Sequence, residues 1–119
     1  MLVKLLAVAA GGAFGSLLRF GLQKALNHAF PFGTLAVNLL GCLLIGMFWG
    51  WLGKGTSEGE TARLLLMSGF CGGFTTFSAF SQESVVLLQS HRFTAFIFYT
   101  LVSVAGGLIA TFAGYKFTT

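Results

Sequence analysis

Charge is the scarcest feature of this 119-residue chain, because only 8% of its residues are Asp, Glu, Lys or Arg. A soluble domain of this length needs a largely polar surface, and a chain that is 55% hydrophobic cannot supply one. The composition therefore excludes a soluble globular domain and indicates a membrane protein. The net charge of +4 requires no nucleic-acid partner, since lysine and arginine at lipid headgroups account for it.

Residues that carry out catalysis are also scarce. The two histidines, His28 and His91, fall in loops, and no His/Cys/Asp/Glu cluster has the spacing of metal ligands. There is no nucleophile beside a base and no phosphate-binding loop, so an enzyme is not expected. The two cysteines, Cys42 and Cys71, lie in apolar segments, where free buried thiols are expected rather than a disulfide.

Long hydrophobic runs are abundant. Each is at or above the roughly 20 residues that cross a hydrocarbon core of about 30 Å. Strict alternation of apolar and polar residues is missing, which argues against a β-barrel. The sequence therefore predicts an all-α membrane protein, a single domain over residues 1–119 with four transmembrane helices, over residues 2–26, 33–52, 62–88 and 93–115.

The basic residues are almost evenly divided between the two sides of such a bundle. Alternating helices place one group beside the termini, namely Lys4, Lys54, Arg63 and Lys116. The opposite side receives Arg19, Lys24 and Arg92. Because cytoplasmic loops are normally enriched in Lys and Arg, this balance gives little preference for one orientation and favours insertion both ways round.

Glycine is plentiful, with 17 residues, and several belong to small-xxx-small pairs that let helices approach closely in lipid. Four helices enclose little volume, so we expect an oligomer. Packing within one chain accounts for some of these pairs, and an antiparallel homodimer would use the rest. The pairs are Gly11 with Gly15, Gly46 with Gly50, Ser103 with Gly107, and Ala110 with Gly114.

Polar side chains inside the apolar segments are few, and each has two interpretations. Thr34 and Asn38 share one helix face, as do Tyr99 and Ser103, because both pairs are four residues apart. Asn38 either bonds helix to helix or lines a polar route. The second pair continues to Gly107 and Thr111 on the same stripe, whose hydroxyls either bond back to their own helix or line a route. Arg19 either reaches to the membrane surface or lies at the entrance of an anion route.

The stretch GFCGGFTTFSAF, residues 69–80, interrupts an otherwise plain apolar run. Gly72 and Gly73 followed by Thr75 and Thr76 weaken a helix, and a break in mid-membrane frees backbone groups that need partners. Freed carbonyls are hard oxygen ligands that suit a small cation. The alternative is a continuous helix that the glycines merely soften.

Phenylalanines follow the threonines at three-residue steps, so Phe77 and Phe80 occupy neighbouring turns. The edge of an aromatic ring carries positive potential, and such edges can coordinate a small anion without trapping it. Glu83 lies just beyond on the same face. It is a proton-coupling acid, a structural hydrogen-bond partner or a residue at the membrane edge.

Three ordered motifs in the chain resemble the Fluc (CrcB) family of small fluoride channels. Residues 11–19 are similar to its GGxxGxxxR, residues 33–41 to its GTLxVNxxG and residues 69–80 to its GFCGGFTTFSTF. The resemblance covers essentially the whole length. It departs from the family pattern at Ala79, where threonine is common, and at Gly107, where a further serine is expected.

The resemblance implies an antiparallel, dual-topology homodimer in a prokaryotic plasma membrane, the inner membrane in a Gram-negative cell. Each dimer would hold two pores that release cytoplasmic fluoride passively and so confer fluoride resistance. A structural Na⁺ would lie at the dimer centre on the backbone carbonyls of Gly72 and Thr75, and Arg19 would lie near an aqueous vestibule. The expected pore residues are Asn38, Phe77, Phe80, Thr34, Ser78, Tyr99, Ser103 and Glu83.

A proton-coupled small multidrug transporter is the alternative, since such carriers share this size, four helices and dual topology. That function needs a central membrane carboxylate that exchanges protons with a cationic drug. In this chain the first helix offers Arg19 instead, and Glu83 lies away from the centre.

Overall fold

The computed structural model describes residues 1–53 and 57–119, and helices dominate that part of the chain. Lys54, one of the basic residues expected beside the termini, lies outside the described residues. The third long run is built from several segments, as is the fourth, and a short 3₁₀ turn, η1 (Ser57–Gly59), precedes the third. The elements are α1 (Leu2–Leu26), α2 (Phe32–Leu52), α3 (Glu60–Arg63), η2 (Leu64–Cys71), α4 (Gly72–Phe74), α5 (Phe77–Gln89), α6 (Phe93–Leu101), η3 (Val102–Gly106) and α7 (Gly107–Thr118).

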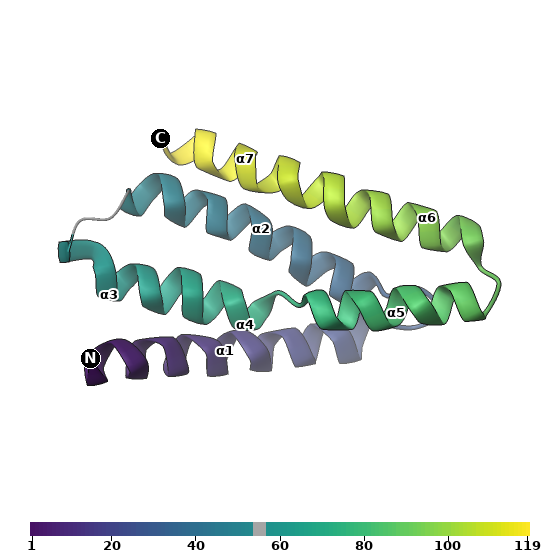
Figure 1. Cartoon of the computed structure of the whole chain (residues 1–119), viewed down its shortest axis with the longest axis horizontal. Coiled ribbons are helices and arrows are strands. Elements are labelled where there is room, and N and C mark those ends of the chain that lie inside the picture. The colour runs from purple at the N-terminus through teal and green to yellow at the C-terminus, as the bar shows by residue number, and fades with distance from the viewer. Residues whose placement is uncertain (54–56) are drawn as a thin grey trace.

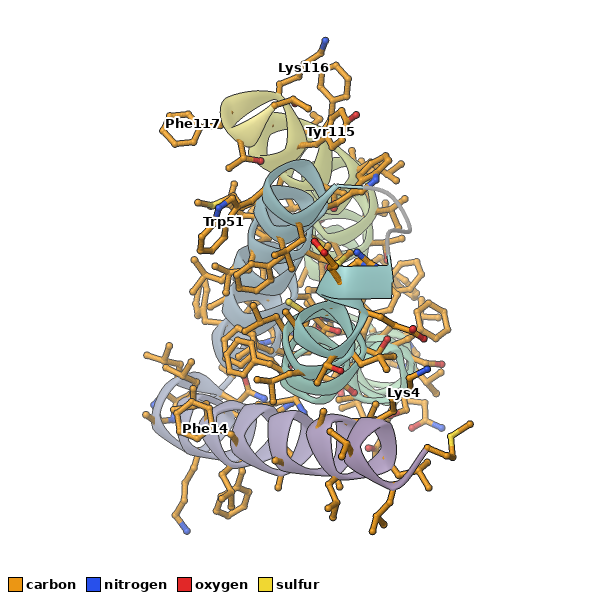
Figure 2. All side chains as sticks on the ribbon, turned by 90° about the vertical axis from the view of Figure 1, so that its left-hand side faces the viewer. Lys4, Phe14, Trp51, Tyr115, Lys116 and Phe117 are labelled. Carbon is orange, nitrogen blue, oxygen red and sulfur yellow. The ribbon has the colours of Figure 1, made fainter. Side chains whose placement is uncertain are left out.

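Within the described residues, four helical runs are long and apolar enough to cross a membrane, which confirms the predicted all-α class. They alternate in direction, so both termini lie at one end and the α1–α2 and α5–α6 connections at the other (Figure 1). We call these the terminal end and the connection end. Figure 2 looks onto the terminal end, and Lys4, Trp51, Tyr115 and Lys116, which it labels, belong to the ends of α1, α2 and α7 that lie there. Aromatic and basic side chains of this kind are typical of a membrane surface.

Glycines let two pairs of helices approach closely within the chain. A Cβ added at Gly11 of α1 would lie 2.2 Å from the Leu65 carbonyl oxygen, and one added at Gly15 would lie 2.3 Å from the Phe70 carbonyl oxygen. A Cβ at Gly46 of α2 would lie 2.0 Å from the Thr111 carbonyl oxygen. Substitution at any of these positions would force backbones apart.

The small-xxx-small pairs are therefore used more within the chain than the sequence suggests. Besides those three glycines, a Cβ at Gly50 would lie 2.1 Å from Oγ1 of Thr118, and one at Gly114 would lie 2.3 Å from the Leu43 carbonyl oxygen. These positions already face a helix of their own chain.

The third run is interrupted at two residues. Thr75 (φ −90°, ψ 160°) and Thr76 (φ −154°, ψ 114°) are both extended, and they separate α4 from α5. The interpretation of a continuous, softened helix is therefore wrong. The paired glycines do not make the break, because Gly72 and Gly73 are still helical. Gly73 instead allows close packing, since its Cβ would lie 2.5 Å from the Gly12 carbonyl oxygen.

Little apolar surface is buried inside one chain. A small core joins α2, α5 and α6 through Leu35, Leu87 and Tyr99. Large apolar side chains are exposed on all four runs, such as Leu17 and Leu108, each 70% exposed. A helix that is apolar around its circumference suits a lipid environment. Both cysteines are free, as expected, with Cys71 buried and Cys42 half-buried.

Candidate functional site

A groove of about 460 Å³ runs between α2, the interruption in the third run and the η3–α7 segment. Asn38 lines it from α2, and Gly72, Thr75 and Thr76 line it from the interruption. Aromatic rings from α5 and small polar residues from the fourth run also line it, namely Phe77, Phe80, Ser103 and Thr111. The rest of the lining is mostly apolar and includes Ile45, Met67 and Leu108. We refer to this feature as the groove.

Asn38 holds the extended segment in place. Its Nδ2 donates to the Thr76 carbonyl oxygen (3.1 Å), and its Oδ1 accepts from the Thr76 backbone N–H (2.7 Å). Thr76 in turn caps α5, because its Oγ1 accepts from the Ala79 N–H (3.1 Å). Asn38 therefore links α2 to the third run by hydrogen bonds, and its side chain also lines the groove. Both interpretations drawn from the sequence fit this position.

These contacts deprive two carbonyls of their usual donors. In a continuous helix the Gly72 carbonyl accepts from the Thr76 N–H and the Thr75 carbonyl from the Ala79 N–H. Here Asn38 takes the first N–H and the Thr76 hydroxyl takes the second. Gly72 is exposed on the groove side. The backbone carbonyl oxygens of Gly72 and Thr75 thus fit a small hard cation, because such cations prefer oxygen ligands.

Arg19 of α1 lies beside the same interruption. Its Nε donates to the Gly73 carbonyl oxygen (2.9 Å), and its Nη1 donates to Oε1 of Gln23 (3.3 Å). A cation is favourable at the carboxyl end of a helix because it offsets the partial negative charge there. Neither interpretation of Arg19 from the sequence included this bond to the backbone of the third run.

A second group of polar residues surrounds Glu83, and we call it the carboxylate cluster. Oε2 of Glu83 accepts from Nδ2 of Asn27 (3.0 Å) and from Oγ1 of Thr34 (2.9 Å). Oε1 accepts from the hydroxyl of Tyr99 (2.8 Å), and both Thr34 and Tyr99 are fully buried. Of the three interpretations of Glu83, the geometry supports the structural hydrogen-bond partner.

Gln23 and Asn27 belong to the carboxylate cluster, and neither was expected from the sequence. Gln23 donates from Nε2 to Oγ1 of Thr34 (3.0 Å). Asn27 donates to the same hydroxyl (3.1 Å) and accepts from the Thr34 N–H (3.1 Å). A signal was available, because Arg19, Gln23 and Asn27 recur every four residues, along one face of the first helix and onto its C-cap.

Phe80 connects the two groups. It lines the groove, and its ring centroid lies 5.7 Å from that of Phe77 and 5.1 Å from that of Tyr99. Phe77 is 79% exposed, so the outer wall of the groove is open in a single chain. Ser78 belongs to neither group; its hydroxyl is exposed and lies 3.2 Å from that of Thr76.

The expected stripe from Tyr99 to Ser103 is divided between the two groups. Tyr99 turns toward Glu83, whereas Ser103 lines the groove. The π-helical turn η3 starts at Val102, and π-helical geometry shifts the phase of the residues that follow. The Ser103 hydroxyl is buried and has no hydrogen-bond partner within residues 1–53 and 57–119. Its O–H is therefore not committed to another described group of the chain.

The described residues that line the groove thus offer an amide, hydroxyl groups and aromatic rings, and none of them carries a side-chain charge. In the part of the chain that the structure describes, no group of three His, Cys, Asp or Glu residues could hold a metal ion. A surface of this kind can replace the hydration shell of a small anion, because it supplies donors and no competing acceptor carboxylate.

Comparison with known protein families assigns the chain to one of them. The family model described as CrcB-like protein, Camphor Resistance (CrcB), matches residues 6–115. The chain belongs to the CrcB family. The resemblance read from the three motifs is thereby confirmed, and CrcB membership makes the chain a multi-pass membrane protein and not an enzyme.

Curated CrcB relatives come from several bacteria. A protein of Flavobacterium psychrophilum is 42% identical over 111 residues, covering 90% of each chain. One from Pseudomonas putida is 46% identical over 123 aligned positions, covering 99% of this chain and 98% of the relative. One from Serratia proteamaculans is 46% identical and covers 93% and 90%. All three are named fluoride-specific ion channel FluC.

Proposed function

We propose that this CrcB protein is a passive, fluoride-selective channel that exports cytoplasmic fluoride across a prokaryotic plasma membrane. The observation that carries the proposal is the groove, to which the motifs shared with the family contribute Asn38, Phe77 and Phe80. The names of the bacterial relatives support fluoride as the ion. Export protects a cell because HF enters through lipid, dissociates inside and leaves fluoride behind.

Fluoride chemistry suits such a lining. Fluoride is strongly hydrated and accepts hydrogen bonds avidly, so a narrow dry route must replace its water with donors. The unpaired Ser103 hydroxyl is one such donor, and the edges of Phe77 and Phe80 would supply weak positive potential. Ser78 does not line the groove of a single chain, and in this proposal its exposed hydroxyl adds a donor only once a second chain closes the route. Larger chloride is more weakly hydrated and gains less from the same groups.

A second copy of the chain completes the groove in this proposal. A ring that is 79% exposed, as Phe77 is, leaves a wall open that a partner would close. The almost equal division of basic residues favours an antiparallel partner, which would set the interruption at Thr75 and Thr76 at mid-membrane and create two equivalent pores. Arg19 would then lie near the aqueous vestibule, beside the Gly73 carbonyl it binds.

A structural Na⁺ at the dimer centre is part of the same proposal. The carbonyls of Gly72 and Thr75, which have lost their usual helical donors, would hold it. Bound there, the ion would supply fixed positive charge between the two chains. The chain itself prepares the site, because Asn38 and the Thr76 hydroxyl keep the segment extended.

The multidrug-transporter alternative gains no support. Such a carrier needs a membrane carboxylate that is free to take a proton and bind a cation. Glu83 is instead engaged by Asn27, Thr34 and Tyr99. The curated relatives carry the name of an ion channel rather than of a carrier.

Fluoride efflux from liposomes tests the proposal. Purified protein is reconstituted with internal potassium fluoride, and efflux is started with a potassium ionophore at equal pH on both sides. We expect rapid release of fluoride with no proton gradient and little release of chloride. Efflux that requires a proton gradient, or release of an organic cation in its place, would overturn the proposal in favour of the carrier.

A further inference from the structure

A second cavity, of about 640 Å³, opens at the connection end of the molecule. Four phenylalanine rings and two potentially cationic side chains line it, namely Phe30, Phe32, Phe93, Phe98, His91 and Arg92. Arg92 is exposed, and its Nη1 donates to the Ala29 carbonyl oxygen. The positive charge is therefore held at the rim of an aromatic cavity, which we call the outer cavity.

The loop of residues 27–31 separates the outer cavity from the carboxylate cluster. An isolated bridge between Asn27 and Pro31 closes the loop. Its first residue, Asn27, donates to Glu83, and its third, Ala29, accepts from Arg92. One short loop is thus tied to the cluster at one point and to the rim of the outer cavity at another.

Phe30 is the side chain that stands between them. It lines the outer cavity, and its ring meets that of Tyr99 edge to face, with centroids 5.4 Å apart. Tyr99 itself has no exposed surface. The Phe30 ring also lies 4.7 Å from that of Phe32 and 5.8 Å from that of Phe98, both of which line the outer cavity.

Ring contacts consequently run without a gap from the groove to the outer cavity. Phe77 meets Phe80 at 5.7 Å, Phe80 meets Tyr99 at 5.1 Å, and Tyr99 meets Phe30 at 5.4 Å. The series begins on the groove and ends on the outer cavity.

We propose that the outer cavity is the aqueous mouth at one end of the fluoride route, and that Phe30 is the ring that separates this mouth from the dry segment. The inference rests on the proposed function and deepens it. Fluoride regains water in the outer cavity, where Arg92 raises the local concentration of anions. The edge of Phe30 continues the positive ring potential up to that point.

A cysteine at Thr94, an exposed residue that lines the outer cavity, tests the position of the mouth. Thr94→Cys is labelled in detergent with a negatively charged methanethiosulfonate or a positively charged one of similar size, and is then reconstituted. The matched control is Ser90→Cys, an exposed residue at the end of α5 that does not line the cavity. Treated wild-type protein controls for Cys42 and Cys71.

We expect the negative label at Thr94→Cys to lower fluoride efflux by about tenfold or more, a difference of about 1.4 kcal/mol in barrier, and the positive label to lower it less. Labelled Ser90→Cys keeps the wild-type rate. Complete labelling of Thr94→Cys with no change in efflux would overturn the proposal and leave the cavity as a lipid-facing groove. Unlabelled wild-type protein reports separately on the proposed function, because its failure to pass fluoride would contradict the channel itself.

Substitution of the ring provides a second test. Phe30→Leu removes the contact with Tyr99, whereas Phe20→Leu is the matched change at an exposed position of α1 that lines neither cavity. We expect Phe30→Leu to change fluoride efflux by about fivefold or more and to reduce selectivity over chloride, while Phe20→Leu stays within about twofold. Equal effects from the two substitutions would show that Phe30 does not separate the mouth from the dry segment.

Discussion

The groove and the carboxylate cluster both contain polar groups, but they differ in what those groups can still do. In the cluster, Asn27, Thr34 and Tyr99 are already committed to Glu83. In the groove, the Ser103 hydroxyl has no partner within the described residues, and Phe77 is largely exposed. A donor that a carboxylate already occupies is not available to a passing anion. The groove is therefore suited to bind an ion, and the cluster is suited to fix α1, α2, α5 and α6 relative to one another.

The largest loss of fluoride efflux should come from a substitution of Asn38, because this side chain holds the extended segment that lines the groove. Asn38→Ala leaves the N–H and carbonyl of Thr76 without their partners, and each unpaired buried group costs about 1–3 kcal/mol. We expect fluoride efflux from liposomes to fall by about 100-fold, because the extended segment is no longer held. Leu40→Ala, at an exposed position on the same helix, is the control and should keep its efflux. Wild-type efflux from Asn38→Ala would contradict this role.

A smaller effect is expected from Phe80, which joins the two regions. Phe80→Ile keeps an apolar side chain of useful size but removes the ring that contacts both Phe77 and Tyr99. We expect fluoride efflux to fall by about tenfold, since the positive ring edge is lost. Phe112→Ile, on an exposed position away from both regions, should have no effect. Equal losses in the two variants would indicate a general effect on packing.

The smallest effect on transport is expected in the cluster. Glu83→Gln replaces one acceptor oxygen with an NH₂ group that faces hydrogen-bond donors, so thermal unfolding in detergent should show a loss of about 1–3 kcal/mol. Efflux should fall by less than about fivefold and stay independent of a proton gradient. A folded Glu83→Gln variant with no transport at all would make Glu83 part of the conduction step and remove the distinction between the regions.

The sequence predicted those features that depend on length and local pattern. Four apolar runs of membrane length are visible without a structure, and the motif residues Asn38, Phe77 and Phe80 could be identified as candidates. The position of the break could not be predicted from the glycines, because Gly73 serves close packing against Gly12 and the interruption depends on Asn38 from another helix. The partners of Glu83 could not be predicted for the same reason. Its donors Asn27 and Tyr99 lie 56 and 16 residues away and meet it only after the helices pack.

Reversal potential in a planar bilayer tests most directly the claim that fluoride passes alone and passively through uncharged donors. With a tenfold fluoride gradient, equal chloride and equal pH on both sides, the account predicts current that reverses near the fluoride equilibrium potential of about 59 mV. It also predicts that an added pH gradient leaves this potential unchanged. Reversal near zero, or a potential that follows the pH gradient, would contradict the account.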